Sequence, residues 1–237
     1  LINYYRGFLP LGMLACVENQ KRLLAPLPRV IRYTMQWRYC SICVGEDIDS
    51  YGLPYFHIEH QLPALTRCPA HDALLRSGCN ACGNDWHKLG QLLTPPLEPQ
   101  CDKCESPISL VNDFMDDDVS WLQKTSYRLL QGEFESLNLP RLQKAYRDHL
   151  GVGSREGILN LRDRAIVQEA QNLVDNYFDP RLYHLIFTNA DMAGQQKRSP
   201  SLSIYKAAFI TKLNLPPIVH LLIIRVLFGE IENIPGL

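Results

Sequence analysis

Four short stretches decide how this chain folds: Cys40-Ser41-Ile42-Cys43, Cys68-Pro69-Ala70-His71, Cys79-Asn80-Ala81-Cys82 and Cys101-Asp102-Lys103-Cys104. In each stretch, here called a knuckle, two metal-binding side chains are separated by two residues. Together the knuckles hold seven of the eight cysteines. A two-residue gap lets a tight turn direct both side chains at one ion, and zinc binds four such ligands in a tetrahedron. The four knuckles therefore predict two complete zinc sites.

The order of the knuckles suggests how they pair. The first site would contain Cys40, Cys43, Cys68 and His71, and the second would contain Cys79, Cys82, Cys101 and Cys104. This order is typical of two successive zinc ribbons or fingers. The other arrangement is interleaved, so that the first and third knuckles share an ion. Each ion would have four protein ligands and no open position for water, so we expect two structural zinc ions that support folding.

The alternative use of these cysteines is a disulfide framework. The chain shows no secretory signal, and closely spaced cysteine pairs are then more often metal-bound in a reducing cytosol. We therefore expect zinc, and a cytoplasmic protein. Cys16 stands apart among apolar neighbours and is predicted to be a small core residue.

One motif points to an enzyme, because His57-Ile58-Glu59 matches the first half of the zinc deaminase signature. The second half fails: the second knuckle lacks a preceding proline and ends in His71, and its use would leave the first knuckle without a partner. Nucleotide-binding glycine motifs and the serine nucleophile motif are also missing from the sequence. We therefore predict that the protein is not an enzyme. The remaining candidates are His57, Glu59, His60 and His87. Each is either an ordinary surface or core residue or a group that orients a metal ligand through a hydrogen bond.

Charge is unevenly distributed along the chain. The 237 residues carry 24 Lys and Arg against 25 Asp and Glu, yet residues 1–39 have a net charge of +5, residues 40–120 of −9 and residues 121–237 of +3. Nucleic-acid affinity depends on Lys and Arg side chains that neutralise phosphates. The acidic, cysteine-rich part is therefore a poor phosphate binder, and DNA contacts are expected in the flanking parts.

The sequence predicts a mostly α fold with small β elements of the zinc-ribbon or zinc-finger kind. Residues 1–39 form a basic, helical lead-in segment, residues 40–110 a tandem zinc-binding module, and residues 111–237 a helical domain. Caps and apolar spacing predict helices over residues 119–131, 139–150, 161–177 and 216–228, with a short helix beginning at Asp179-Pro180. The longest apolar run, residues 218–228, is too short to span a membrane and predicts a buried helix.

Residues 141–164 combine a helix, a glycine-bearing turn and a second helix. This order is compatible with a helix-turn-helix, whose second helix enters the major groove of DNA. Six basic side chains are candidates for DNA contacts: Arg141, Lys144, Arg147, Arg155, Arg162 and Arg164. Nearby acidic residues reduce the net positive charge of this segment. The alternative interpretation is that the six side chains lie on the solvated face of a plain helical bundle.

Three motifs lie close together around the first two knuckles. They are R-Y-C-x-x-C at residues 38–43, H-Q-L-P at residues 60–63 and C-P-x-H at residues 68–71. This pattern resembles the TniQ/TnsD family of transposition proteins, most densely over residues 37–75. Residues 216–222 are similar to the helical part of TnsD-like members, though less specifically.

The resemblance implies a target-selection adaptor for bacterial DNA transposition. Such a protein recognises double-stranded target DNA and recruits an AAA+ ATPase regulator that brings the transposase. The alternative within the family is a subunit of a CRISPR-associated complex with a guide RNA. Because the chain begins with Leu1 and not with Met, we expect a fragment. The resemblance implies that the missing parts are the family's N-terminal helical region and the C-terminal DNA-binding segments of TnsD-like members.

Overall fold

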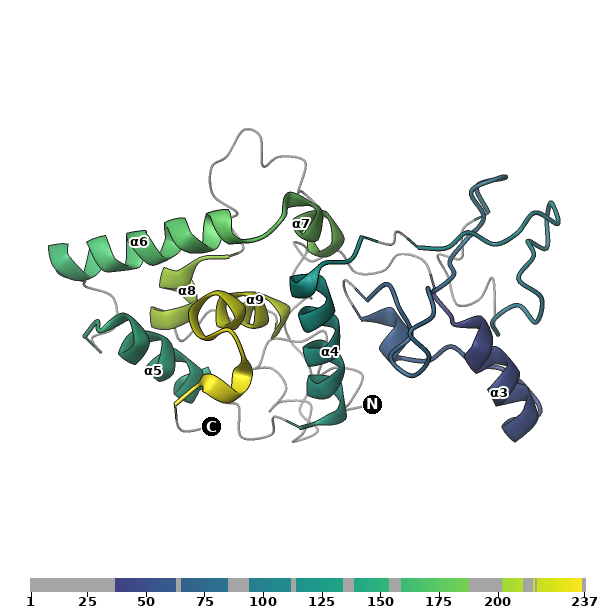
Figure 1. Ribbon diagram of the computed structural model, residues 1–237, viewed down its shortest axis with the longest axis horizontal. Coiled ribbons are helices and arrows are strands. Elements are labelled where there is room, and N and C mark those ends of the chain that lie inside the picture. Colours follow the sequence, from purple (N-terminus) through teal and green to yellow (C-terminus); the bar gives the residue numbers. More distant parts are fainter. Residues whose placement is uncertain are drawn as a thin grey trace.

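A computed structural model describes residues 37–62, 65–84, 94–111, 114–133, 139–153, 159–187, 202–210, 215 and 217–235. In these residues the chain forms a cysteine-rich lobe and a helical lobe, which meet at helix α4 (Asp117–Gln131) (Figure 1). Most of the predicted lead-in segment lies outside the described residues, as do Cys16, His87 and Arg155.

The cysteine-rich lobe has one regular helix, α3 (Ser41–Tyr51), and one turn of 3-10 helix, η1 (Glu59–Gln61). Helix α3 begins directly after Cys40 and ends at Gly52, whose φ of 79° reverses the chain and lets its N–H donate to the Ile48 carbonyl. The remaining described residues of this lobe are turns and extended segments. They are joined by isolated β-bridges that pair Tyr39 with Arg76, Arg67 with Leu74, Arg76 with Leu110, Cys79 with Asn84, and Gln100 with Pro107.

The predicted β elements are thus reduced to single bridges within the described residues. Three of the knuckles reverse the chain within a few residues, so the flanking segments pair once and then diverge. A ladder of one bridge supplies little stability of its own. The stability of this lobe therefore depends on contacts between its side chains and on any metal ion that they bind.

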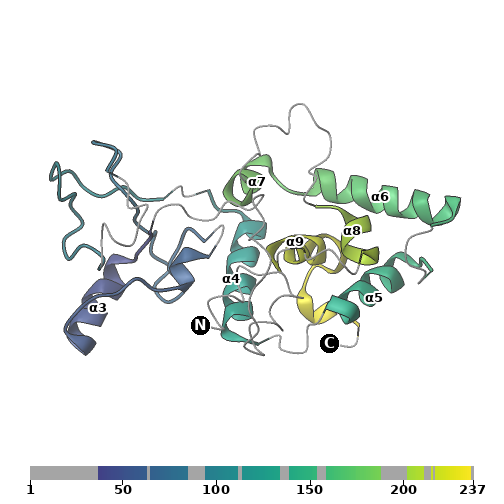
Figure 2. The same cartoon turned by 180° about the vertical axis from the view of Figure 1, so that it is seen from behind.

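The helical lobe confirms the prediction of a mostly α fold. It contains α4, α5 (Leu139–Leu150), α6 (Leu161–Tyr177), α7 (Pro180–Ile186), α8 (Ile204–Phe209), α9 (Pro217–Phe228) and the 3-10 turn η4 (Ile231–Asn233). Figures 1 and 2 show α9 between α4 and α8, and its residues from Pro217 to Ile224 are buried. It packs against α4 and α6, while α8 packs against α5 and α6. Among the described residues, no helix has both the length and the apolar composition to cross a membrane.

The helix ends follow from capping side chains that the sequence displays. The Asp116 carboxylate accepts a hydrogen bond from the Val119 amide at 2.7 Å, and the Asn160 side chain accepts one from the Asp163 amide at 2.8 Å. Such caps satisfy amides that have no partner within the helix. The sequence did not predict α8, a helix of only six residues that begins at Ser203.

Helix α4 ties the two lobes together. One face of α4 places Val119, Trp121 and Leu122 in the main hydrophobic core. Near its carboxyl end Leu130 packs in a separate core with Leu62 and the first cysteine cluster. The buried Gln123 side chain also donates a 3.0 Å hydrogen bond to the Thr66 hydroxyl.

Candidate metal centres

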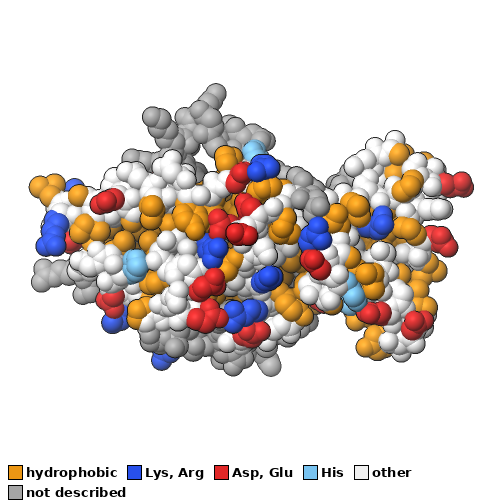
Figure 3. All heavy atoms as spheres, viewed as in Figure 1, with side chains coloured by type: hydrophobic (Ala, Val, Ile, Leu, Met, Phe, Trp, Pro, Cys, Tyr) orange, Lys and Arg blue, Asp and Glu red, His pale blue; other side chains and the backbone are white. Residues whose placement is uncertain are grey.

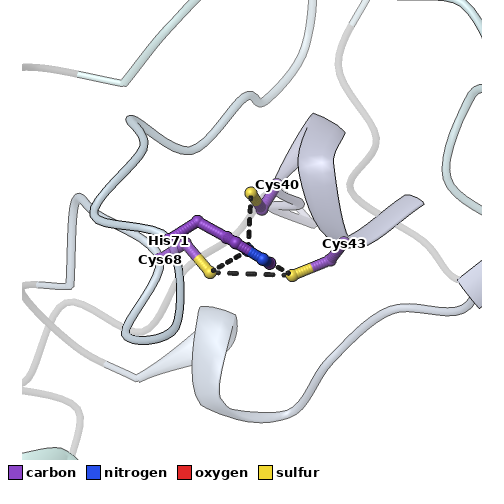
Figure 4. A group of neighbouring side chains, drawn as sticks. All are labelled: Cys40, Cys43, Cys68 and His71. Carbon is purple, nitrogen blue, oxygen red and sulfur yellow. Dashed lines mark hydrogen bonds between the residues drawn. The ribbon is translucent and has the colours of Figure 1, made fainter. Parts of the chain in front are cut away.

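The first cluster gathers Cys40, Cys43, Cys68 and His71, whose ligand atoms lie within 4.8 Å of one another (Figure 4). Cys40 lies at the residue before the first turn of α3 and Cys43 lies in that turn, so that the helix directs both sulfurs to one side. Cys68 and His71 come from a tight turn that faces the helix. The three cysteines are buried, and His71 is partly exposed.

The distances in this cluster fit a tetrahedral ion. The His71 Nδ1 atom lies 3.8 Å from Cys40 Sγ, 3.4 Å from Cys43 Sγ and 3.5 Å from Cys68 Sγ, and the Cys43 and Cys68 sulfurs are 3.6 Å apart. Around a zinc ion the edges of such a tetrahedron are about 3.8 Å between sulfurs and about 3.6 Å from sulfur to nitrogen. The cluster could therefore hold a metal ion without rearrangement of its ligands.

Glu46 orients the histidine. The His71 Nε2 atom, on the far side of the ring from the sulfurs, lies 3.0 Å from Glu46 Oε1. This hydrogen bond raises the pKa of His71. A carboxylate behind a metal-binding histidine fixes the ring and increases its basicity. Glu46 was not among the predicted orienting groups, although it lies three residues after Cys43, on the next turn of α3.

The three sulfurs ionise unequally. A hydrogen bond with the Cys68 side chain lowers the pKa of Cys40 to about 5, whereas burial raises the pKa of Cys43 to about 12. The same hydrogen bond raises the pKa of Cys68. Because zinc binds thiolates, binding of an ion would release the protons that Cys43 and Cys68 retain.

His60 lies directly behind the first cluster. Its Nε2 atom is 3.3 Å from Cys68 Sγ, the ring is buried, and burial lowers its pKa to about 4. A neutral ring with its proton on Nε2 can donate to the sulfur. His60 is thus one of the predicted orienting groups that the structure places beside a cluster residue.

The second cluster gathers Cys79, Cys82, Cys101 and Cys104, also with all sulfurs within 4.8 Å. The sulfurs of Cys79 and Cys104 are 3.6 Å apart, as are those of Cys82 and Cys101. The Lys103 amide and the Asn84 side chain both approach Cys101 Sγ, at 3.5 Å and 3.6 Å, and the amide hydrogen bond lowers the pKa of Cys101 to about 6. Cys82 and Cys104 are exposed, so this cluster lies nearer to solvent than the first.

Three of the four knuckles have the same type of turn. In each, the amide four residues after the first cysteine donates to that cysteine's carbonyl, at distances of 2.8 to 2.9 Å. The donors are Asp72, Gly83 and Glu105, and all three have positive φ, at 51°, 68° and 59°. This conformation favours glycine, which only one of the three turns has. The knuckles therefore pair consecutively: a helical knuckle with a turn in the first cluster, and two turns in the second.

The motifs that carry the family resemblance meet in space. The buried Arg38 guanidinium donates to the carbonyls of Leu62, at 2.6 Å, and Leu65. The Gln61 side chain accepts from the Arg38 amide at 3.0 Å and donates to its carbonyl at 2.7 Å. Arg38 and Gln61 thus fasten the segment before the first knuckle to the segment before the second. Their role was not apparent from spacing alone.

The residues of the deaminase motif have other contacts. The His57 ring lies between two carboxylates, with Nε2 3.0 Å from Asp47 Oδ2 and Nδ1 3.3 Å from Glu59 Oε1. These contacts raise the pKa of His57, chiefly through the hydrogen bond to Glu59. Neither His57 nor Glu59 belongs to the two clusters that could hold a metal among the described residues.

Of the predicted DNA-facing side chains in the described residues, Arg147 is half-buried and the others are exposed. Arg147 donates to the Ala208 carbonyl at 2.6 Å, Arg164 donates to the Leu159 carbonyl at 3.0 Å, and Lys144 lies 2.5 Å from Asp148. Arg141 and Lys144 are exposed on α5, and Arg162 and Arg164 are exposed on α6. Helix α5, the turn at Gly151 and helix α6 follow in the predicted order.

A comparison with known protein families matches the part of the chain that contains the first cluster. The family model named TniQ matches residues 13–75, which include all four residues of the first cluster and the contacts between Arg38 and Gln61. Neither a search of curated proteins nor a search of solved structures gave a match. A TniQ domain supports a general role in transposition, in target selection or DNA binding. Residues 13–75 of this chain are therefore similar to the TniQ family.

Proposed function

We propose that this protein is a DNA-binding target-selection adaptor of bacterial transposition. It recognises a target site on duplex DNA and recruits an AAA+ ATPase regulator, which brings the transposase. The TniQ match over residues 13–75 carries this proposal. It is supported by the two clusters, because four protein ligands leave a metal ion no open position at which to activate water.

In this proposal the two clusters hold two structural zinc ions. Their ligands are Cys40, Cys43, Cys68 and His71 in the first, and Cys79, Cys82, Cys101 and Cys104 in the second. Zinc in such sites stabilises the fold and supplies no chemistry. Residues 40–110 then form a tandem zinc module that connects the lead-in segment, residues 1–39, to the helical domain, residues 111–237.

Duplex DNA would contact α5 and α6, the two helices of the predicted helix-turn-helix. The candidates for phosphate contacts are the exposed basic side chains of these two helices, Arg141, Lys144, Arg162 and Arg164, whereas Arg147 is half-buried and donates to the Ala208 carbonyl. Such contacts neutralise phosphates and make affinity dependent on salt.

A gel shift with duplex DNA of random sequence, repeated over a range of salt concentrations, tests this part. Replacing Arg141 and Arg162 by Gln should weaken binding and lower the slope of log affinity against log salt by about two. Replacing the exposed Lys124 of α4 by Gln is the matched control and should leave the slope unchanged. An unchanged slope in the double variant would assign α5 and α6 to a solvated face.

A second candidate function is a subunit of an RNA-guided targeting complex. It is favoured by the segment from Tyr39 to Thr66, which contains no Lys or Arg and is therefore suited to protein rather than to nucleic acid. Affinity purification with the products of neighbouring genes separates the two functions. Copurification of a guide RNA, together with the absence of a duplex gel shift, would support the second.

A further inference from the structure

The cysteine-rich lobe exposes a group of large apolar side chains after the middle of α3. They are Ile48, Tyr51, Leu53, Tyr55 and Ile58, with exposed fractions of 37%, 67%, 56%, 44% and 41%. We call this group the tyrosine patch. A single exposed apolar residue is ordinary, but a contiguous group on a protein surface marks an interaction site.

The members of the tyrosine patch are neighbours. Ile48 and Tyr51 are one turn apart on α3, and the rings of Tyr51 and Tyr55 meet edge to face with their centroids 6.1 Å apart. Tyr55 in turn stacks on the His57 ring at 4.4 Å, next to Ile58. The patch is therefore a continuous strip that runs from the helix onto the following loop.

The loop that carries three of the five patch residues is held in place. Asp47, which is buried on α3, accepts hydrogen bonds from the Tyr55 amide at 3.4 Å and from His57 Nε2 at 3.0 Å. Glu59 holds the other nitrogen of the same ring. A surface fixed in this way loses little conformational entropy when a partner binds.

The charge around the patch is of one sign. Between Arg38 and Arg67 the chain has no Lys or Arg, and it has four carboxylates: Glu46, Asp47, Asp49 and Glu59. Figure 3 shows hydrophobic and acidic side chains together on the outer part of the lobe that contains α3. Such a surface repels phosphates and attracts cationic side chains. A second copy of this patch would meet it with like charges, which disfavours self-association.

We propose that the tyrosine patch is the docking surface for an amphipathic helix of a partner protein, with apolar side chains on one face and Lys or Arg beside them. The apolar face covers Tyr51, Leu53 and Tyr55, and the cations face Glu46 and Asp49. This proposal rests on the adaptor role and assigns its protein-recruiting surface. It places that surface on the cysteine-rich lobe, on a different lobe from α5 and α6.

The test uses the full, zinc-loaded chain and a fluorescent synthetic helix of Leu and Lys with its leucines on one face. Anisotropy should show saturable binding that weakens with salt. The variant with Tyr51→Ser and Leu53→Ser should bind at least about 10-fold more weakly, as expected for the loss of central apolar anchors. Leu97→Ser is the matched control in the same lobe, since Leu97 is 69% exposed, and should bind as the wild type does. A helix with Glu in place of Lys should not bind.

Each contrary result overturns the proposal. Equal binding of the Lys and Glu helices, or unchanged binding by the double serine variant, would show that the patch does not select a cationic partner. A dimer that the serine variant abolishes would assign the patch to a second copy. Failure of the wild type to bind, together with a lower melting temperature in the serine variant, would show that the chain itself covers the patch. The duplex gel shift should be unchanged in this variant, so the proposed DNA role is tested independently of the tyrosine patch.

Discussion

His71 connects the first cysteine cluster to Glu46. Its Nδ1 atom faces three sulfurs at 3.4 to 3.8 Å, and its Nε2 atom lies 3.0 Å from Glu46 Oε1. One ring thus joins two knuckles to the second turn of α3. The same ring that completes the cluster also holds the helix against the turn at Cys68.

Replacing Glu46 by Gln should lower the zinc affinity of the first cluster by about 10-fold, because a carboxylate that orients a metal-binding histidine typically contributes this much. Competition with a chromophoric chelator measures the affinity. Asp49→Asn removes another exposed carboxylate from the same helix and should have little effect. Equal losses in the two variants would mean that only the general negative charge matters.

Removal of the metal should unfold the cysteine-rich lobe and leave the helical lobe folded. The bridges in this lobe are single and its cores are small, whereas the helical lobe has a large core of its own. We expect a strong chelator to expose the lobe to protease between Cys40 and Cys104 while most helical circular dichroism remains. Native protein should contain two equivalents of zinc, and protease resistance that survives complete metal removal would contradict this prediction.

Gly83→Ala should destabilise the cysteine-rich lobe by about 1 kcal/mol, since an alanine at positive φ is strained. The φ of Gly83 is 68°, and an added Cβ would meet no atom within 4 Å, so the backbone conformation alone sets this cost. Gly45 has equal space but lies within α3. Gly45→Ala should therefore stabilise by about 0.5–1 kcal/mol. Urea unfolding of both variants gives the comparison, and changes of the same sign would refute it.

The stability of the helical lobe should fall as the pH drops from about 6.5 to about 4. Burial lowers the pKa of His220 to about 4, whereas an unfolded histidine titrates near 6.5. In this window the unfolded chain binds a proton that the folded chain excludes, which costs up to about 3 kcal/mol. His220→Phe should flatten this slope relative to wild type in urea unfolding. His149→Gln, which replaces an exposed histidine of α5, should retain the slope.

The ion pair between Arg225 and Asp118 should contribute a coupling energy of about 1 kcal/mol. Arg225 Nε lies 2.8 Å from Asp118 Oδ1, the two side chains are 18% and 21% exposed, and the guanidinium covers the Trp121 ring. A double-mutant cycle with Arg225→Gln and Asp118→Asn measures this coupling. The control cycle at Lys144 and Asp148, whose side chains are 72% and 56% exposed, should give less than about 0.5 kcal/mol. Equal couplings would show that burial adds nothing here.

Several helices could be predicted because their signals are local. The helices over residues 139–150 and 161–177 were predicted with the bounds that the structure gives, since a cap and an apolar period mark each one. Helix α3 was not predicted from its sequence, which includes Gly45 and five residues that are acidic or serine. Its helical form depends on tertiary contacts, through Cys43, Asp47 and the Glu46 contact to His71.

The amino-acid sequence by itself determined which eight side chains could bind metal and where most helices begin and end, because ligand spacing and caps act within a few residues. Only the tertiary structure decided that neighbouring knuckles pair. It also showed that Glu46 supports His71, that Arg38 meets Gln61, and that the side chains of the tyrosine patch are exposed within the described part of the chain. These contacts join residues far apart in the chain, and no local pattern specifies which distant partner each side chain meets.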